Sequence, residues 1–405
     1  MKENIKNALY KKQTLYKIVK YLYILIKCLF YSLISLLYYM FRVFPINNRK
    51  IVFCSYFGNG YGDNPKYIAE EIINQKLNID MVWLLRKELF LSHNLPPSIR
   101  PVKKNSLRGI YEMVTAKVWI DNSRKPYFVK KRKDQYYIQT WHGAPALKKI
   151  EKDVEDKLDK IYVKNAKEDS DKVDLFLSNC KHFSNLIKKS FWYNGEILEC
   201  GLPRNDIIFK RNKIINEKVR KYFNISKDKK IVLYAPTFRK NSNIDVYNLD
   251  INMCLNSLTN RFKGEWVFLV RLHPNVQYKT FDILNKKNVF NASLYDDLQE
   301  ILSVVDVLIT DYSSLMFDFA LTGLPVFLYA PDIEDYKNDR NFYFCFEELP
   351  FSLAENNYDL SNAINNFNEV KYKEDLKSFF NYIGSFENGN ASKIVVDKIK
   401  EIVFY

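Results

Sequence analysis

Short runs of consecutive apolar residues recur along the chain from residue 50 onward, and helical stretches separate them. The runs are 51–57, 81–86, 118–123, 136–141, 174–180, 196–201, 231–238, 266–274, 307–313 and 325–331. Because their apolar side chains fall on consecutive positions, these runs are typical of strands buried on both faces. Buried strands that alternate with helices predict a parallel α/β fold.

A polar segment, residues 206–230, divides the predicted strands into two groups. Because 405 residues exceed the size of one small domain, we predict two Rossmann-like domains facing a cleft. The predicted boundaries are 1–48 for an N-terminal helix, 49–206 for the first domain, and 207–405 for the second domain with a C-terminal helix. Ligands of such sheets bind at the carboxyl ends of strands, so candidate site residues are those that follow strands.

The N-terminal segment carries most of the net charge. Residues 1–50 hold ten Lys or Arg against one acid, Glu3, which gives +9 of the net +15. Residues 5–44 contain no Pro or Gly, and helical spacing separates two faces. The basic face holds Lys6, Lys17, Lys20, Lys27 and Arg42, and the opposite face holds Leu15, Leu22, Ile26, Leu29, Leu33, Leu37 and Met40.

This pattern predicts an amphipathic helix that lies in the interface of an anionic membrane, at its cytoplasmic face. Two alternatives stay open. Residues 21–41 contain one charge and are long enough to span a bilayer, or the helix packs on the protein's own core. We expect no nucleic-acid partner.

The polar residue types give no metal or cofactor signature. The six cysteines include no CxxC pair and lie in apolar runs, which is typical of reduced cytoplasmic proteins. The chain has no HxxxH motif, no paired DxD at a strand end and no Walker A loop. We therefore expect neither a metal nor a cofactor.

Two of four histidines follow predicted buried strands. The four are His93, His142, His182 and His273. His142 follows the run 136–141, and His273 stands near the end of the run 266–274. One histidine at a strand end is more often structural than catalytic, but two in separate domains favour a catalytic pair. We give His93 no role, and His182 opens a helix as a surface or cap residue.

Basic side chains accompany both histidines. Arg271 lies two residues before His273, so a strand would place both on one face, where they suit a diphosphate. The alternative is an Arg–carboxylate pair. Lys148 is expected one to two turns into a helix that begins near Ala144, where it would neutralise a phosphate or face solvent.

The segment 310–318 (TDYSSLMFD) predicts a strand followed by a helix. Ser313 and Ser314 would begin this helix, either as ordinary caps or as phosphate ligands. Asp318, one turn on, is placed to receive a sugar or polyol hydroxyl.

Two further strand ends bring an arginine toward the cleft. Arg204 follows the run 196–201, and Arg239 ends the run that begins at 231. The basic segment 124–133 is interpreted as a contact for anionic lipid or a phosphate-rich acceptor, with a solvated loop as the equal alternative.

Taken together and in order, several segments resemble the CDP-glycerol glycerophosphotransferase family of teichoic acid primases and polymerases. They are YGDNPKYI (61–68), QTWHGAPALKK (139–149), GLPRND (201–206), YAPTFR (234–239), VRLHP (270–274) and TDYSSLMFD (310–318). The resemblance runs from about residue 50 to the C-terminus. It departs after residue 350, where the family commonly has Gly and Pro and this chain has FSLA (351–354).

The resemblance implies a glycosyltransferase-B fold and peripheral membrane attachment. It also implies transfer of glycerol phosphate, or another polyol phosphate, from CDP-glycerol or CDP-ribitol to a lipid-linked or polymeric acceptor. CMP would be released, in teichoic acid or capsular polymer synthesis. The first domain would lie on the acceptor side, and the second would bind the CDP donor.

The resemblance assigns His142 and His273 as the essential pair. The expected substrate-binding residues are Trp141, Gly143, Ala144, Pro145, Lys148, Arg204, Pro236, Thr237, Arg239, Arg271, Leu272, Asp311, Ser313, Ser314 and Asp318. We expect His142 to act as general base and His273 to hold the diphosphate, although these roles are interchangeable at this stage. A nucleotide-sugar glycosyltransferase and a non-catalytic membrane scaffold are the alternatives.

Overall fold

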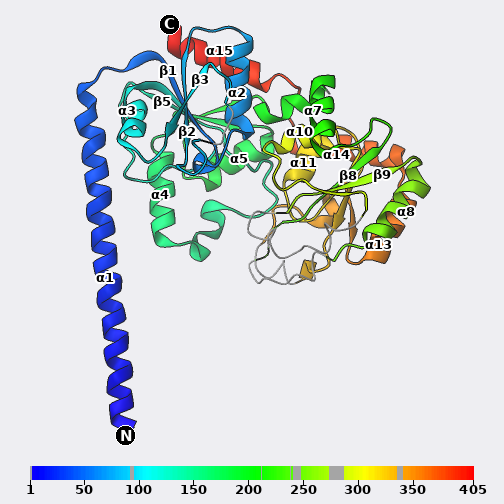
Figure 1. Ribbon diagram of the computed structural model, residues 1–405, viewed down its shortest axis with the longest axis horizontal. Coiled ribbons are helices and arrows are strands. Elements are labelled where there is room, and N and C mark those ends of the chain that lie inside the picture. The colour runs from blue at the N-terminus through cyan, green and yellow to red at the C-terminus, as the bar shows by residue number, and fades with distance from the viewer. Residues whose placement is uncertain are drawn as a thin grey trace.

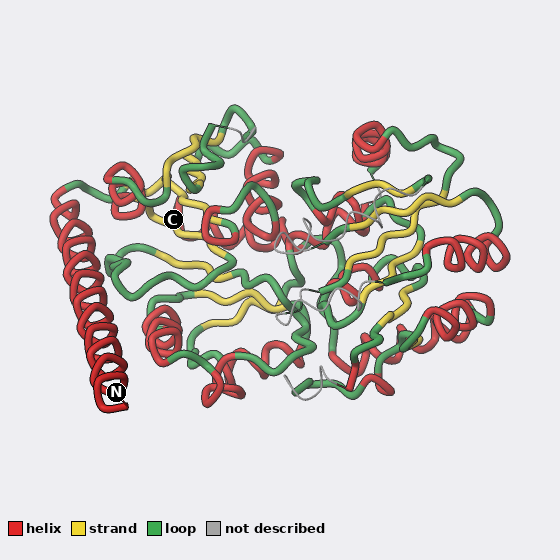
Figure 2. The backbone as a smooth tube through the Cα atoms, turned by 60° about the horizontal axis from the view of Figure 1, so that its bottom comes forward, coloured by secondary structure: helices red, strands yellow, loops and turns green. Residues whose placement is uncertain are grey.

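Two parallel β-sheets, each flanked by helices, stand side by side in the computed structural model (Figures 1 and 2). The structure describes residues 2–91, 95–210, 212–237, 239, 248–272, 287–334 and 341–405, and the side chains of residues 2–16, 20, 23 and 24 are outside this description. The predicted α/β architecture with an N-terminal helix is confirmed.

The first sheet has seven parallel strands in the order β3-β2-β1-β4-β5-β6-β7. They are β1 (Asn47–Cys54), β2 (Asp80–Leu85), β3 (Ile99–Lys103), β4 (Ala116–Asp121), β5 (Tyr136–Gln139), β6 (Leu175–Ser178) and β7 (Glu196–Glu199). In β1 and β4, residues such as Ile51 and Val118 are fully buried, because helices cover both faces. The edge strand β3 was not predicted: it contains Pro101, which a sheet tolerates at its edge.

The second sheet has six parallel strands in the order β10-β9-β8-β11-β12-β13. They are β8 (Lys230–Ala235), β9 (Trp266–Val270), β10 (Val289–Asn291), β11 (Val307–Thr310), β12 (Val326–Tyr329) and β13 (Ser352–Ala354). The four longer strands match the predicted runs. The two outer strands, β10 and β13, have three residues each and lack a continuous apolar pattern.

Helices cover both faces of each sheet. They are α2 (Asp63–Asn74), α3 (Leu107–Thr115), α4 (Lys160–Ser170), α5 (Lys181–Ser190), α6 (Asp206–Lys210), α7 (Lys213–Phe223), α8 (Ile251–Phe262), α10 (Leu298–Leu302), α11 (Leu315–Ala320), α13 (Asn357–Asn365), α14 (Glu369–Ile383) and α15 (Ala391–Phe404). Short 3₁₀ turns are η1 (Phe41–Val43), η2 (Tyr56–Gly58), η3 (Glu151–Lys157), η4 (Pro203–Asn205) and η6 (Phe346–Glu348). The predicted C-terminal helix is two helices, α14 and α15, because Gly384 adopts φ +64° and ends α14.

The last helix returns to the first sheet. In Figure 1, α15 lies beside α2 and β1. Its apolar residues Val395, Val396 and Ile399 are buried in the same core as Ile51. The chain therefore crosses between the sheets near residues 201–206 and again before α15, whereas the sequence placed this helix with the second domain. The domain boundaries themselves stay a prediction.

Asp206 joins the two crossings. Its carboxylate accepts hydrogen bonds from the backbone N–H groups of Ala391 (3.0 Å) and Ser392 (2.7 Å). These groups open α15, where they have no partner inside the helix. Asp206, in the first crossing, thus caps α15, the helix that follows the second crossing.

The N-terminal helix α1 (Lys2–Met40) projects away from the rest of the molecule (Figure 1). Near its C-terminal end, the Tyr31 ring stacks on Phe128 with centroids 4.5 Å apart, and Ser35 Oγ donates to the Phe128 carbonyl at 3.2 Å. Tyr38 is buried. Leu29 and Leu33, by contrast, are 62% and 55% exposed. Within the part of α1 whose side chains are described, only one face of the helix packs on the protein's own core.

We expect Asp206→Ala to lower the free energy of unfolding by about 1–2 kcal/mol, because two N–H groups of α15 lose their acceptor. Urea unfolding followed by circular dichroism measures this loss. Asp397→Ala is the matched control, since Asp397 lies on α15 and, among the described residues, pairs with the exposed Lys393 and the partly exposed Lys400; it should change stability by less than about 0.5 kcal/mol. Equal effects of the two variants would contradict the capping role.

Candidate active site

His142 stands exposed at the carboxyl end of β5. The preceding residue, Trp141, adopts φ +51°, a left-handed conformation that turns the chain sharply after the strand. The Trp141 ring is buried and stacks on the imidazole, with centroids 4.8 Å apart. Ala144 and Pro145 are also buried, so His142 is the exposed side chain of a firmly held loop.

A backbone carbonyl sets the tautomer of His142. The Nδ1 atom lies 2.6 Å from the carbonyl oxygen of Asn122. Because a carbonyl only accepts hydrogen bonds, Nδ1 carries the hydrogen and Nε2 of the neutral ring is left with a lone pair. The exposed nitrogen is therefore the one able to accept a proton.

Arg204 lies directly beneath this loop and is 3% exposed. Its Nη1 donates to the carbonyl oxygen of His142 at 2.9 Å, and its Nε donates to Asp318 Oδ2 at 3.0 Å. Nη1 also pairs with Asp63 at 3.3 Å. Burial lowers the pKa of Arg204, but Asp318 and Asp63 raise it by more, so the guanidinium stays charged.

Asp318, on α11, has partners other than the predicted substrate hydroxyl. Besides two bonds from Arg204, its carboxylate accepts from Asn205 Nδ2 at 3.1 Å and from Gln299 Nε2 at 3.0 Å. The residue is 4% exposed. The protein itself thus occupies the acceptor positions of this carboxylate.

Asp311 and Arg239 hold the loop after β8. Asp311 accepts from the Thr237 backbone N–H at 2.9 Å and from its hydroxyl at 2.7 Å, and it pairs with Arg239 at 2.9 Å. Arg239 also makes a bidentate contact with Asp332, at 2.6 and 3.0 Å. Pro236 is buried in this segment. The network fixes the ends of β8 and β11 relative to each other.

Arg271 follows β9 and is bound by carbonyl groups. Its Nη1 donates to the carbonyl oxygens of Ala292 and Tyr295, both at 2.7 Å. Within the described residues it forms no carboxylate pair, which was the predicted alternative. Burial lowers its pKa. Leu272 is buried beside it, and His273, the second predicted catalytic residue, lies outside the described residues.

The start of α11 approaches the His142 loop. A Cβ atom added to Gly143 would lie 3.8 Å from Ser314 Oγ. Ser313 Oγ accepts from the backbone N–H of Leu315 at 3.3 Å, whereas Ser314, which directly precedes the helix, makes no side-chain capping bond. The structure therefore brings together the predicted segments around residues 142 and 313, which are far apart in sequence.

Lys148 does not lie on a helix, and this part of the prediction is wrong. Residues 147–149 run beside residues 341–343: the Leu147 carbonyl accepts from Tyr343 at 2.9 Å, and Lys149 donates to Asn341 at 2.9 Å. This pairing engages the backbone groups that a helix would use. Pro145, which has no N–H, opens the extended segment.

Three residues of the site, Tyr56, Asp63 and Asn64, were not predicted, because no role was assigned to the segment that follows β1. Asn64 Nδ2 donates to the Trp141 carbonyl at 3.1 Å, and Asn64 Oδ1 accepts from the Arg204 backbone at 3.1 Å. Asp63 accepts from the Tyr56 hydroxyl, and both residues adopt positive φ. Strained conformations of this kind cluster at functional sites. The signal was present: an Asp–Asn pair stands six residues after the first predicted strand and begins a helix.

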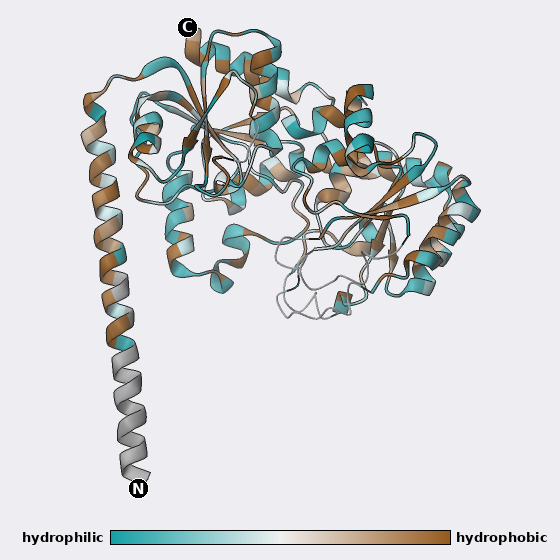
Figure 3. Ribbon diagram, viewed as in Figure 1, coloured by the Kyte–Doolittle hydropathy of each residue, from teal (hydrophilic) through white to brown (hydrophobic). Residues whose placement is uncertain are grey.

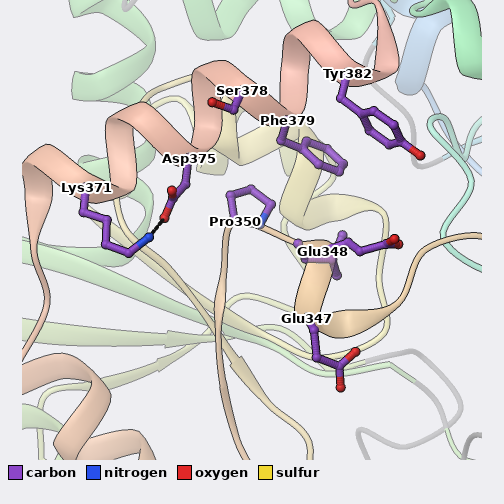
Figure 4. Close-up of a pocket in the computed structure, with 9 residues that line it drawn as sticks. Glu347, Glu348, Pro350, Lys371, Asp375, Ser378, Phe379 and Tyr382 are labelled. Atoms are coloured by element: carbon purple, nitrogen blue, oxygen red, sulfur yellow. Dashed lines mark hydrogen bonds and ion pairs between the residues drawn. The ribbon is translucent and has the colours of Figure 1, made fainter.

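A separate cavity of about 450 Å³ lies between η6 and α14 (Figure 4). Glu347, Glu348, Lys371 and Asp375 lie around it, and Lys371 pairs with Asp375 at 2.6 Å. None of the predicted site residues lines this cavity.

Known proteins share this arrangement. The sequence model described as CDP-Glycerol:Poly(glycerophosphate) glycerophosphotransferase matches residues 36–401. A teichoic acid poly(glycerol phosphate) polymerase of Bacillus spizizenii is 32% identical over 90% of this chain and 95% of its own. A teichoic acid glycerol-phosphate transferase of Staphylococcus aureus is 32% identical over 87% of this chain and 93% of its own.

Solved structures agree. The wall teichoic acid polymerase TagF superposes with a TM-score of 0.80 at 28% identity, covering 93% of this chain and 95% of that chain. A TagF variant soaked with CDPG gives 0.79 at 30% identity, with 88% and 90% covered. A UDP-GlcNAc 2-epimerase from Neisseria meningitidis, at 12% identity and a TM-score of 0.51, covering 87% of this chain and all of its own, shares the fold.

Two parallel sheets with the candidate site at their strand ends define a protein of glycosyltransferase-B architecture. Within that class, the chain belongs to the CDP-glycerol:poly(glycerophosphate) glycerophosphotransferase family. The family predicted from the sequence is thereby confirmed.

Close to this site, burial raises the pKa of Glu387 from 4.5 to about 8, and the nearby Asp318 carboxylate adds to the effect. The folded protein therefore keeps a proton that the unfolded chain releases above about pH 4.5, so the free energy of unfolding falls as pH rises from about 5 to 8. We expect Glu387→Gln to remove this dependence, and to stabilise the protein more at about pH 8.5 than at about pH 5.

Urea unfolding midpoints at the two pH values measure this effect, with the exposed Glu347→Gln as control. A Glu387→Gln effect that is independent of pH would contradict the shifted pKa.

Proposed function

We propose that this protein transfers glycerol phosphate from CDP-glycerol to a hydroxyl group of a lipid-linked or polymeric acceptor and releases CMP. The polymer would be a teichoic acid or a capsular polymer. One observation carries the proposal: His142 is exposed with its Nδ1 bound and its Nε2 without a hydrogen-bond partner among the described residues, and its neighbour Gly143 lies beside Ser314 of the other half, in a chain of this family.

In the proposed reaction, His142 Nε2 takes the proton of the acceptor hydroxyl. The acceptor oxygen then forms a bond to the phosphorus that carries glycerol, and the bond from this phosphorus to the CMP oxygen breaks. Because Asn122 accepts the Nδ1 hydrogen, the imidazolium formed on the way is stabilised and kept in orientation. Reactions of this type depend on positioning and on neutralising charge.

The donor diphosphate would lie against the second sheet. Arg271 makes both carbonyl contacts through Nη1, so within the described residues its Nε and Nη2 are not engaged by them. The hydroxyl groups of Ser313 and Ser314 stand beside the His142 loop. We assign these groups, together with His273, to binding the diphosphate and stabilising the departing CMP.

Identity to relatives favours glycerol as the polyol. Four relatives that are 30% to 32% identical are named for glycerol phosphate, as are two primases at 28% and 27%. Two relatives named for ribitol phosphate are 29% and 26% identical. CDP-ribitol is therefore the competing donor for the assay.

We expect His142→Ala to lower CMP release from CDP-glycerol at least about 100-fold, because the general base is lost. The measurement is CMP release in the presence of a lipid-linked or oligomeric glycerol-phosphate acceptor. His182→Ala is the matched control and should keep wild-type activity. A His142→Ala protein with near wild-type turnover would remove the proposed base. If the wild-type enzyme used nucleotide sugars and not CDP-glycerol, the proposed donor would be wrong.

We also propose that α1 holds the protein on the cytoplasmic membrane surface. With about 100° per residue, Tyr31, Ser35 and Tyr38 lie in the same sector as Lys27, and this sector packs on the body. The opposite sector holds exposed apolar residues, and brown bands make up much of the coloured part of α1 in Figure 3. The exposed residues include Leu22, Ile26, Leu29, Leu33 and Met40. The apolar face thus points away from the body, and the body would sit above a helix lying in the interface.

Charge favours this interfacial position over a span. Residues 25–43 are long and apolar enough to cross a bilayer. A crossing with the body in the cytoplasm would carry six lysines, those between residues 2 and 20, to the outer side. This arrangement opposes the preference of basic residues for the cytoplasmic side.

The segment 124–133 contributes only part of the predicted basic contact. Arg124 and Lys125 are buried in ion pairs with Glu151 and Asp121. The later part of the segment binds η1, the turn that follows α1: Arg42 donates to the Lys131 carbonyl at 3.2 Å. We assign the remaining lipid contact to Lys130 and Lys133, because Lys131 pairs with Asp174 and Arg132 donates to the Phe44 carbonyl oxygen at 2.7 Å.

We expect the double variant Leu29→Glu/Leu33→Glu to lower binding to phosphatidylglycerol vesicles at least about tenfold, because two carboxylates would enter the apolar face. Co-sedimentation measures this. Ile214→Glu, which also places a charge on an exposed apolar residue but on α7, is the control and should bind normally. Unchanged binding of the double variant would contradict the role of α1. Wild-type protein that resists extraction by alkaline carbonate would indicate a span.

A further inference from the structure

We infer that Arg204 and Asp318 are positioning residues that connect the donor side of the cleft to the base His142, and that they do not contact the substrate. The inference rests on the proposed function. It departs from the expectation that both residues bind the CDP-polyol.

The guanidinium of Arg204 is fully engaged by the protein. Its Nε and Nη2 donate to the two oxygens of Asp318 at 3.0 and 3.3 Å. Its Nη1 donates to the His142 carbonyl and pairs with Asp63. At 3% exposure there is no open face on which a substrate phosphate could rest.

The other end of this connection is α11. Asp318 lies within this six-residue helix, which starts directly after Ser314. Its carboxylate is held in place by Asn205 and Gln299 in addition to Arg204. A diphosphate bound at Ser313 and Ser314 would therefore fix α11, and with it the carboxylate that orients the guanidinium.

At the near end, His142 is held at two points, one on its ring and one on its backbone. The Asn122 carbonyl accepts from Nδ1 at 2.6 Å, and the Arg204 guanidinium binds the carbonyl of His142 itself at 2.9 Å. Loss of the second contact would let the backbone shift while the ring stays hydrogen-bonded, so Nε2 would move relative to the acceptor. A misplacement of about 1 Å costs about 100-fold in rate.

The test uses the full-length protein with Asp318→Asn, Arg204→Lys and the double variant. We expect each single variant to lower kcat about 10- to 100-fold, with the KM for CDP-glycerol within about twofold of wild type, and the double variant to be no slower than the worse single variant. Asp318→Glu, which keeps the charge, should recover part of the loss. Asp318→Asn and Asp318→Glu decide the matter if Arg204→Lys does not fold.

Glu112→Gln is the matched structural control. It weakens a buried ion pair, Lys50 to Glu112 at 2.7 Å, at the opposite end of β1 from the site. We expect it to lower stability but to leave kcat unchanged.

A second measurement tests, without any substrate, whether Asp318 and Arg204 affect the His142 ring. In ¹⁵N-histidine-labelled protein, the His142 ring signals, assigned with His142→Ala, should shift in Asp318→Asn and Arg204→Lys and stay in place in Glu112→Gln. Unchanged His142 signals, an unchanged kcat, or a KM raised at least tenfold at constant kcat would overturn the inference. A wild-type protein that releases no CMP from CDP-glycerol would instead remove the proposed donor, and the ring signals would still decide the connection.

Discussion

The contact of the buried Arg204 guanidinium with carboxylates from both halves of the molecule sets the arrangement of the two sheets. Removing a charged side chain from water costs several kcal/mol unless an opposite charge and hydrogen bonds compensate. Asp63 follows strand β1 of the first sheet, and Asp318 lies on α11 beside the second sheet. The buried charge of Arg204 is therefore compensated only when both halves are in place. Lys66 repeats this logic nearby, since it reaches across to Asp297 at 2.5 Å and Glu300 at 3.0 Å.

These buried ion pairs explain how loops with unfavourable backbone conformations keep one shape. Trp141, Tyr56 and Asp63 all adopt positive φ, which costs of order 1 kcal/mol or more for each residue. The surrounding polar groups hold them: Asn64 binds the Trp141 carbonyl, and the Asn122 side chain accepts from the Tyr56 backbone at 2.8 Å. Strain and hydrogen bonds together present one exposed nitrogen of His142 at the cleft.

The central strands were predictable from the sequence because burial on both faces requires continuous apolar runs, as in 51–57 and 231–238. The edge strands β3, β10 and β13 were not, since each is short or half-exposed and its pairing depends on a neighbour, whereas the fourth edge strand, β7, lies within the predicted run 196–201. The packing of α15 on the first sheet was also beyond sequence patterns. An amphipathic helix shows that it has an apolar face, but not which sheet covers that face.

The candidate site shows the same division. Sequence reasoning found the loops that meet, because residues after buried parallel strands collect at one edge of a sheet. It did not separate residues that touch a ligand from residues that hold others in place, since both follow strands and both are polar. Arg239, which follows β8, and Asp318, which lies on α11, illustrate this. Both are ion-paired, and both form their hydrogen bonds with other groups of the protein. Only the partners of a side chain distinguish the two roles, and the partners come from segments that the fold brings together. His142 differs from them because the protein occupies Nδ1 and leaves Nε2 at the exposed edge of the ring.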